Sequence, residues 1–274
     1  MPASFPVTVA LVLMALLYLR GWMHLRNAIP AWRAAVFLGG LFCVWIAVAS
    51  PLVALDEELL SIHMVQHLLL MTMAPPLLLL GSPVLPLLRG FPRFATRGAL
   101  GPVLRFPPVQ RLGHLFTSPV VCWFAATIVL IGWHVPPAFA LALGSESWHR
   151  VEHASFLAGG LLFWWPVIPS WPSVSHPRWS TVLYLFLATL PCDALSAFLA
   201  FCDRVVYPSY LVVPRGFSMS PLQDQQCAGA LMWVCVTFAY LIPAVAITTR
   251  LLANPDPCEQ TAVRPILTKV RPGE

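Results

Sequence analysis

Two histidine pairs with the same spacing are the residues best suited to chemistry in this sequence. The stretches His63-Met-Val-Gln-His67 and His149-Arg-Val-Glu-His153 both read His-x-x-(Gln/Glu)-His. Residues four apart lie on one face of a helix, about one turn from each other. With 8 histidines in 274 residues, two such pairs exceed what chance would give. Neutral imidazole is a ligand for copper, zinc and iron, so each pair offers two metal ligands from one helix face.

The composition indicates an integral membrane protein. The chain is 58% hydrophobic and 10% charged, with a mean hydropathy of +0.77. A soluble domain carries about 25% charged residues. The net charge of +5 does not favour nucleic-acid binding, because the basic residues fall in particular loops between apolar runs.

The predicted fold is all-α, with seven transmembrane helices in one membrane domain over residues 1–252. A spanning helix needs about 20 mostly apolar residues. Seven runs qualify, near residues 5–23, 34–54, 59–80, 118–133, 148–168, 179–201 and 227–251. Pro75-Pro76 should kink the third helix or end its regular part.

The distribution of Lys and Arg predicts the orientation of these helices. Thirteen of the 16 basic residues follow the first, third and fifth runs or lie at the end of the last run and in the tail. Because basic loops stay on the cytoplasmic side, the N-terminus should be outside and the tail, 253–274, cytoplasmic. Both histidine pairs then lie at the same outer depth on parallel helices, and His134 ends the fourth helix on that side.

A metal site is the first hypothesis for this cluster. His63, His67, His149 and His153 would hold one ion or share two, with His134 as an added ligand or an entry point. Gln66 and Glu152 are candidates to orient the imidazoles. Asp193 should face the protein interior, because a carboxyl group inside a membrane is costly. The simpler interpretation is that each pair makes interfacial hydrogen bonds.

Two other classes of function fit parts of the pattern. His149-Arg-Val-Glu-His153 matches the inverted zincin motif, in which Glu152 would activate a zinc-bound water in an intramembrane hydrolase. One haem b between two helices would make an electron-transfer protein. The spacing argues against two stacked haems, because a four-residue step moves only about 6 Å along a helix.

The sulfur-containing residues leave several interpretations open. Cys192, Cys202 and Cys227 fall in the outer half of the predicted bundle. They could be thiolate ligands, which favour cuprous copper, and Cys202 and Cys227 could form a disulfide. Met64 and Met71 lie in the third run, where methionine is typical of packing.

Several stretches, taken in order, resemble the seven-helix CtaG family of cytochrome c oxidase assembly factors. Ser61-Ile-His-Met-Val-Gln-His-Leu-Leu-Leu-Met71 and Ala74-Pro75-Pro76 are similar to the signature of that family. The later blocks with this resemblance are Trp133-His134-Val-Pro136, His149-Arg-Val-Glu-His153, Phe163-Trp164-Trp165-Pro166, Val206-Tyr207-Pro208-Ser-Tyr210 and Asp224-Gln225-Gln226-Cys-Ala-Gly229.

The resemblance implies a multi-pass protein of the bacterial plasma membrane that supplies copper, favoured as Cu(I), to a haem-copper oxidase. By motif position it carries over the five outer histidines, with Asp224 as a polar position. The implied partners are oxidase subunits, membrane lipid and a copper donor on the outer face. The implied role is that of a chaperone, which needs no catalysis.

Overall fold

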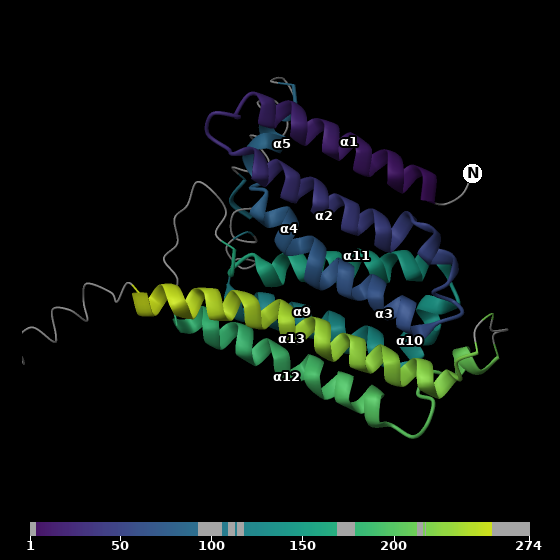
Figure 1. Ribbon diagram of the computed structural model, residues 1–274. Coiled ribbons are helices and arrows are strands. Elements are labelled where there is room, and N and C mark those ends of the chain that lie inside the picture. Colours follow the sequence, from purple (N-terminus) through teal and green to yellow (C-terminus); the bar gives the residue numbers. More distant parts are fainter. Residues whose placement is uncertain are drawn as a thin grey trace, which may run out of the picture.

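The computed structural model describes residues 4–92, 106–108, 113, 118–168, 179–212, 216 and 218–253, and the secondary structure of these residues is helical (Figure 1). The longer helices are α1 (Ser4–Met23), α2 (Ala31–Ala49), α9 (Pro119–His134), α11 (Glu146–Trp164), α12 (Trp179–Phe201) and α13 (Pro221–Ala253). The shorter ones are α3 (Leu60–Leu68), α4 (Ala74–Leu80), α5 (Val84–Gly90) and α10 (Pro136–Leu143). Arg93, Arg97 and the predicted tail beyond Ala253 lie outside the described residues.

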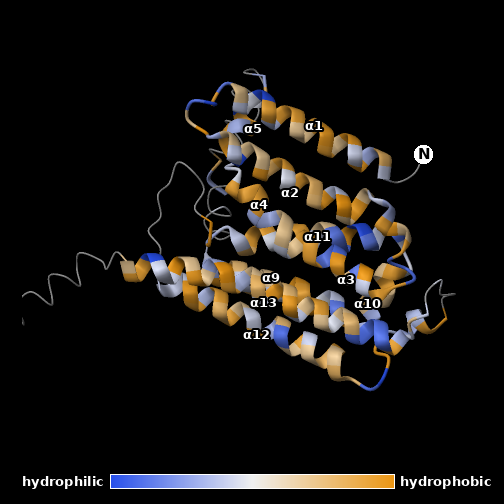
Figure 2. Cartoon of the chain, viewed as in Figure 1, coloured by the Kyte–Doolittle hydropathy of each residue, from blue (hydrophilic) through white to orange (hydrophobic). Residues whose placement is uncertain are grey.

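Fewer helices qualify as membrane spans than the seven predicted. Within the described residues, five stretches are long and apolar enough to cross a membrane: Ser4–Met23, Ala31–Ala54, Leu60–Leu80, Trp179–Phe201 and Pro221–Ala253. A sixth is possible if α9 and α10, which meet at 75°, count as one broken span. In Figure 2, which colours the chain by hydropathy, hydrophobic residues make up most of these helices. The fifth predicted run, now α11, does not qualify, because charged and imidazole side chains in its first turns lower its hydropathy.

A break between α3 and α4 sets the path of the helix that carries the first histidine pair. The backbone widens into a π turn over Leu69–Met73, and α4 then begins with Pro75 and Pro76 near its start. Proline has no N–H, so the carbonyl of Met71 loses its usual donor four residues ahead. The indole Nε1 of Trp164 on α11 donates to this carbonyl at 3.2 Å. The predicted proline kink is therefore also a contact point with α11.

Helix α11 lies in the middle of the bundle, against α4, the π turn and α9 (Figure 1). Gly160 permits the close approach, because a Cβ at this position would lie 2.6 Å from the carbonyl oxygen of Met71 and from Cγ of Pro75. Gly160 follows His153 by seven residues and so shares its helix face. The contact at Gly160 therefore lets the histidine-bearing face of α11 pack closely against the segment that continues from α3, which carries His63 and His67.

One helix that the sequence did not predict, and one that begins earlier than predicted, lie at the end of the bundle where α3 and α11 start. Pro136 and Pro137 open α10 within a stretch that was expected to be a loop, because proline is favoured at the first helical positions. Helix α13 begins at Pro221 rather than near residue 227, so its polar first turns are helical. In Figure 1 this end lies opposite the C-terminal end of α13.

Candidate metal centre

The start of α3 and the start of α11 bring both predicted histidine pairs into one buried cluster. The ring centroids of His63 and His67 are 4.3 Å apart, and those of His149 and His153 are also 4.3 Å apart. Between the helices, the His63 ring lies 5.4 Å from that of His149, and the His67 ring lies 5.8 Å from that of His153. Residues separated by some ninety positions in the chain thus offer four imidazoles within one small volume.

Glu152 lies at the centre of this cluster. Its Oε1 is 3.6 Å from Nε2 of His63 and 3.4 Å from Nε2 of His67, and its Oε2 is 3.9 Å from Nε2 of His149. With metal–ligand bonds of about 2.1 Å, donor atoms at the first two separations subtend roughly 110–120° at an ion, near tetrahedral and trigonal angles. The geometry therefore gives Glu152 the position of a ligand, whereas the sequence suggested a supporting role.

Asp56 joins the cluster, and sequence reasoning missed it. Its Oδ2 lies 3.7 Å from Nε2 of His149, and its backbone carbonyl accepts a hydrogen bond from the Tyr210 hydroxyl at 2.8 Å. Burial raises the pKa of Asp56, while the neighbouring His63 and the Gln66 side chain lower it. The available signal in the sequence was an acidic residue four positions before α3, the helix that carries the first histidine pair.

The donor atoms of the cluster are buried without hydrogen-bond partners in the part of the chain that the structure describes. They include both ring nitrogens of His63 and of His67, both carboxylate oxygens of Glu152, and Nε2 of His149 and of His153. Burying such atoms unpaired is costly. Two groups, His63–His67–Glu152 and Asp56–His63–His149, have their donor atoms within 4.8 Å of one another. A bound cation would compensate these atoms, so the residues present fit a metal ion.

His134 lies beside the cluster but faces another neighbour. Its ring centroid is 6.0 Å from that of His67. Its Nδ1 donates to the carbonyl of Leu130 at 2.7 Å, and its Nε2 lies 3.4 Å from Sδ of Met64. His134 is thus adjacent to the four-histidine cluster without contributing to either group of converging donors.

Asp224, which the sequence suggested as an accessory of the metal site, caps helix α3. From α13, its Oδ2 accepts from the backbone N–H of Leu60 at 2.7 Å, and its Oδ1 accepts from that of Ser61 at 3.1 Å. The first N–H groups of a helix have no partner within the helix, and a carboxylate there also favours the helix dipole. Asp224 therefore sets where α3 begins, and with it the depth of His63.

A second side chain of the same turn fixes the loop between α12 and α13. Oε1 of Gln225 accepts from the N–H of Val206 at 2.7 Å, and its Nε2 donates to the carbonyl of Arg204 at 3.1 Å. This loop carries Tyr207, whose hydroxyl donates to the carbonyl of His134 at 3.0 Å. The aromatic and amide residues of the two motifs therefore hold the end of α9 in place.

Of the remaining predicted residues, Asp193 and the cysteines lie outside the two groups of converging donors, whereas Gln66 lies beside Asp56. Asp193 is on α12 beside Cys192, and its Oδ1 is buried without a hydrogen-bond partner in the described residues. Cys202 is partly buried and Cys227 is exposed, and both are free thiols, so the suggested disulfide between them is not formed. Gln66 is fully buried on α3 beside Asp56.

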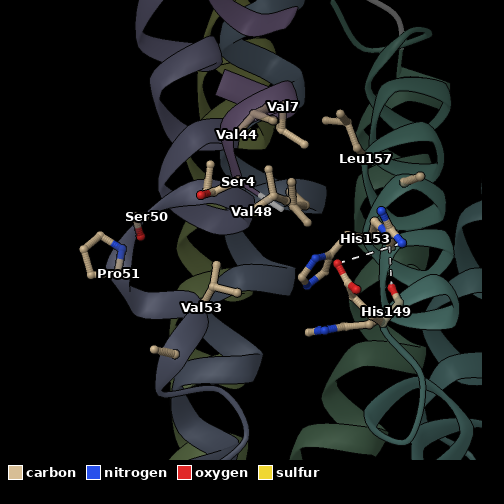
Figure 3. Close-up of a pocket in the computed structure, with 16 residues that line it drawn as sticks. Ser4, Val7, Val44, Val48, Ser50, Pro51, Val53, His149, His153 and Leu157 are labelled. Atoms are coloured by element: carbon tan, nitrogen blue, oxygen red, sulfur yellow. Dashed lines mark hydrogen bonds and ion pairs between the residues drawn. The ribbon is translucent and has the colours of Figure 1, made fainter. Parts of the chain in front are cut away.

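An open cavity of about 720 Å³ leads to the cluster from the side of α1 and α2. Figure 3 shows His149 and His153 on one side of this cavity, across from Val44, Val48 and Val53. Its wall is mostly apolar, and the two imidazoles give it a polar end. The second histidine pair therefore borders both the buried cluster and a route to the outside of the bundle.

The chain has relatives among curated proteins. An uncharacterised protein of Mycobacterium bovis is 26% identical over 87% of this chain and 37% of its own length. An uncharacterised protein of Mycobacterium leprae is 23% identical over 84% of this chain and 36% of its own length. The chain thus spans little more than a third of these relatives. No solved structure matches it.

The family comparison covers most of the chain. The model of the cytochrome c oxidase caa3 assembly factors matches residues 16–254, which include every helix that builds the cluster. This chain belongs to the cytochrome c oxidase caa3 assembly factor family.

Proposed function

We propose that this protein binds a copper ion at the cluster of His63, His67, His149 and Glu152 and delivers it to a haem-copper oxidase during assembly. The family supplies the assembly role. The observation that carries the metal is the set of imidazole and carboxylate atoms that converge, buried and unpaired, between α3 and α11. Copper is the cargo in this account, and the protein makes and breaks no covalent bond.

A small ion suits the cluster better than a haem. A macrocycle held by one imidazole from α3 and one from α11 would have to lie between those helices. The Glu152 carboxylate occupies that space, 3.4–3.9 Å from imidazoles of both helices. A zinc hydrolase would use Glu152 as a base beside an open metal position. Instead, Glu152 lies where it would itself bind the ion.

The residues divide the task of holding and releasing the ion. His63 and Glu152 are fully buried and would keep the ion out of water. His149 is 17% exposed, contacts Asp56 and Glu152, and lines the open cavity with His153. We infer that the ion exchanges ligands through the α11 pair, where an acceptor side chain could replace one imidazole at a time.

The charge distribution supports an outward-facing site. Two of the seven described basic residues, Arg150 and Arg204, lie at the end of the bundle that holds the cluster. The other five lie in or beside helix ends remote from the cluster: Arg20, Arg26, Arg33, Arg89 and Arg250. With the cytoplasm on that side, the cluster faces outward in a bacterial plasma membrane. A copper donor would reach it there, and the oxidase subunits would be the acceptors.

Complementation tests this function in a bacterium whose own copy of the protein is deleted. The double variant His67→Ala/His153→Ala should yield oxidase that contains haem but has lost most of its copper and activity, whereas wild type restores both. The control is His24→Ala, an exposed histidine remote from the cluster. Full copper in oxidase from the double variant would contradict the proposal.

A further inference from the structure

A second, smaller cavity is lined by His67, which also belongs to the group His63–His67–Glu152, called the carboxylate cluster below. Sulfur and imidazole groups make up most of the polar lining of this cavity. Its volume is about 30 Å³. One probe-sized water needs about 10–15 Å³ on this scale, so the space suits an ion and excludes an organic ligand. The side chains that could bind a soft cation there are Met64, His67, Met71, His134, Cys192 and Met232.

These donors come from α3, the π turn, α9, α12 and α13, and all are buried. Met64 is fully buried on α3, Met232 on α13 is 3% exposed, and Cys192 on α12 is 3% exposed. Methionine in a core is usually packing, and Met64 alone would be explained that way. The sulfur of Met64, however, faces a ring nitrogen of His134, and packing alone does not require this arrangement.

The orientation of His134 makes that ring nitrogen available. A carbonyl oxygen only accepts, so the hydrogen bond to Leu130 places the proton of His134 on Nδ1. In the neutral ring, Nε2 then carries a lone pair, and it faces the thioether sulfur of Met64 at 3.4 Å. Neither atom has a hydrogen to offer the other.

That separation fits a metal ion between the two atoms. With bonds of about 2.0 Å to nitrogen and 2.3 Å to sulfur, donors 3.4 Å apart subtend roughly 105° at the ion, close to tetrahedral. His67, whose ring nitrogens are both buried and unpaired, lines the same cavity. Thioether, thiol and imidazole together select Cu(I) over divalent ions.

We propose that this cavity is a second metal site, selective for a monovalent soft cation such as Cu(I), with Met64 Sδ and His134 Nε2 as its defining ligands. The inference deepens the proposed copper role and rests on it for the identity of the natural cargo. His67 borders both sites, with its Nε2 3.4 Å from Glu152. It would join the soft site to the carboxylate cluster.

The test uses the full chain in detergent with Ag(I), a redox-inert analogue of Cu(I), and with Zn(II). Met64→Leu removes the sulfur and conserves volume, so the fold should persist. We expect Ag(I) affinity to fall at least tenfold in Met64→Leu while Zn(II) affinity is unchanged. Met23→Leu, at an exposed position on α1, is the matched control and should change neither. X-ray absorption should show sulfur bonded to silver in wild type.

The outcomes separate this site from the proposed function. Unchanged Ag(I) affinity in Met64→Leu, or silver bonded to nitrogen and oxygen alone, would overturn the soft site even if copper still binds at the carboxylate cluster. Sulfur-bound silver that is lost in Met64→Leu supports the soft site. This support for the soft site holds even if oxidase from the His67→Ala/His153→Ala strain retains full copper. That second result would count against the proposed function alone.

Discussion

Two groups of buried polar side chains lie at the same end of the bundle, and their hydrogen-bonding atoms are used differently. Asp224, Gln225 and Tyr207 direct theirs at backbone groups of neighbouring segments. The other group, around His63 and Glu152, has buried donor atoms without such partners among the residues that the structure describes. Buried polar atoms are normally paired, because leaving them unpaired costs stability. The first group therefore holds neighbouring segments in place, and we propose that the second group binds the metal ion.

Glu152 should show the largest difference between binding and stability. In Glu152→Gln, copper affinity should fall by more than the roughly 10–100-fold that loss of an outer hydrogen-bond partner costs. The melting temperature of the metal-free protein should not fall, because the change removes a buried carboxylate that has no hydrogen bond. Chelator competition and thermal melting measure the two quantities. Glu146→Gln, at an exposed position on the same helix, is the control.

Asp224 should behave in the opposite way. Asp224→Ala leaves the N–H groups of Leu60 and Ser61 without their acceptor, and the free energy of unfolding should fall by about 2–4 kcal/mol. Asp224→Asn retains one acceptor oxygen and should lose less. Denaturant unfolding in detergent checks both. An Asp224→Ala protein as stable as wild type would show that the cap does not hold α3.

Two adjacent glycines on α11, Gly159 and Gly160, should respond differently to substitution by alanine, because only Gly160 is closely packed. Gly160→Ala places a methyl group against Met71 and Pro75, so stability should fall by about 1–3 kcal/mol and copper affinity should fall with it. At Gly159 a Cβ would meet Val129 at an ordinary 3.6 Å. Gly159→Ala should therefore leave binding intact and raise stability by up to about 1 kcal/mol. Equal behaviour of the two variants would remove the argument for close packing at the cluster.

The smallest effect is expected at Tyr207. Tyr207→Phe removes one hydroxyl that donates to the carbonyl of His134. Loss of a single hydrogen bond of this kind should cost about 1 kcal/mol and leave copper affinity at the carboxylate cluster nearly unchanged. Thermal melting and copper titration of the same preparation separate the two. A large loss of copper binding would place His134 among the ligands of that cluster.

Helix periodicity and charge placement were enough to predict the α-helical class and the meeting of the histidine pairs. They did not predict Asp56 or the role of Asp224, because both depend on contacts between distant segments. The Asp224 cap joins residues 164 positions apart. Within the described residues, five or six helices are long and apolar enough to span a membrane and α11 is not among them, so the seventh span stays a prediction. Met64 was assigned to packing, as is usual for methionine in an apolar helix, because helix periodicity does not show that it lies beside His134 of another helix.

Metal analysis of the purified protein is the most direct test of whether the histidine cluster binds copper. Wild type and a variant with His63, His67, His149 and His153 changed to Ala would be purified from copper-supplied cells, and copper per chain would be measured. The variant should fold, as judged by its thermal transition, because Nε2 of each of these histidines is buried without a hydrogen-bond partner in the part of the chain that the structure describes. We expect copper to co-purify with wild type and to be lost from the variant. Equal copper in both, or no copper in wild type, would contradict it.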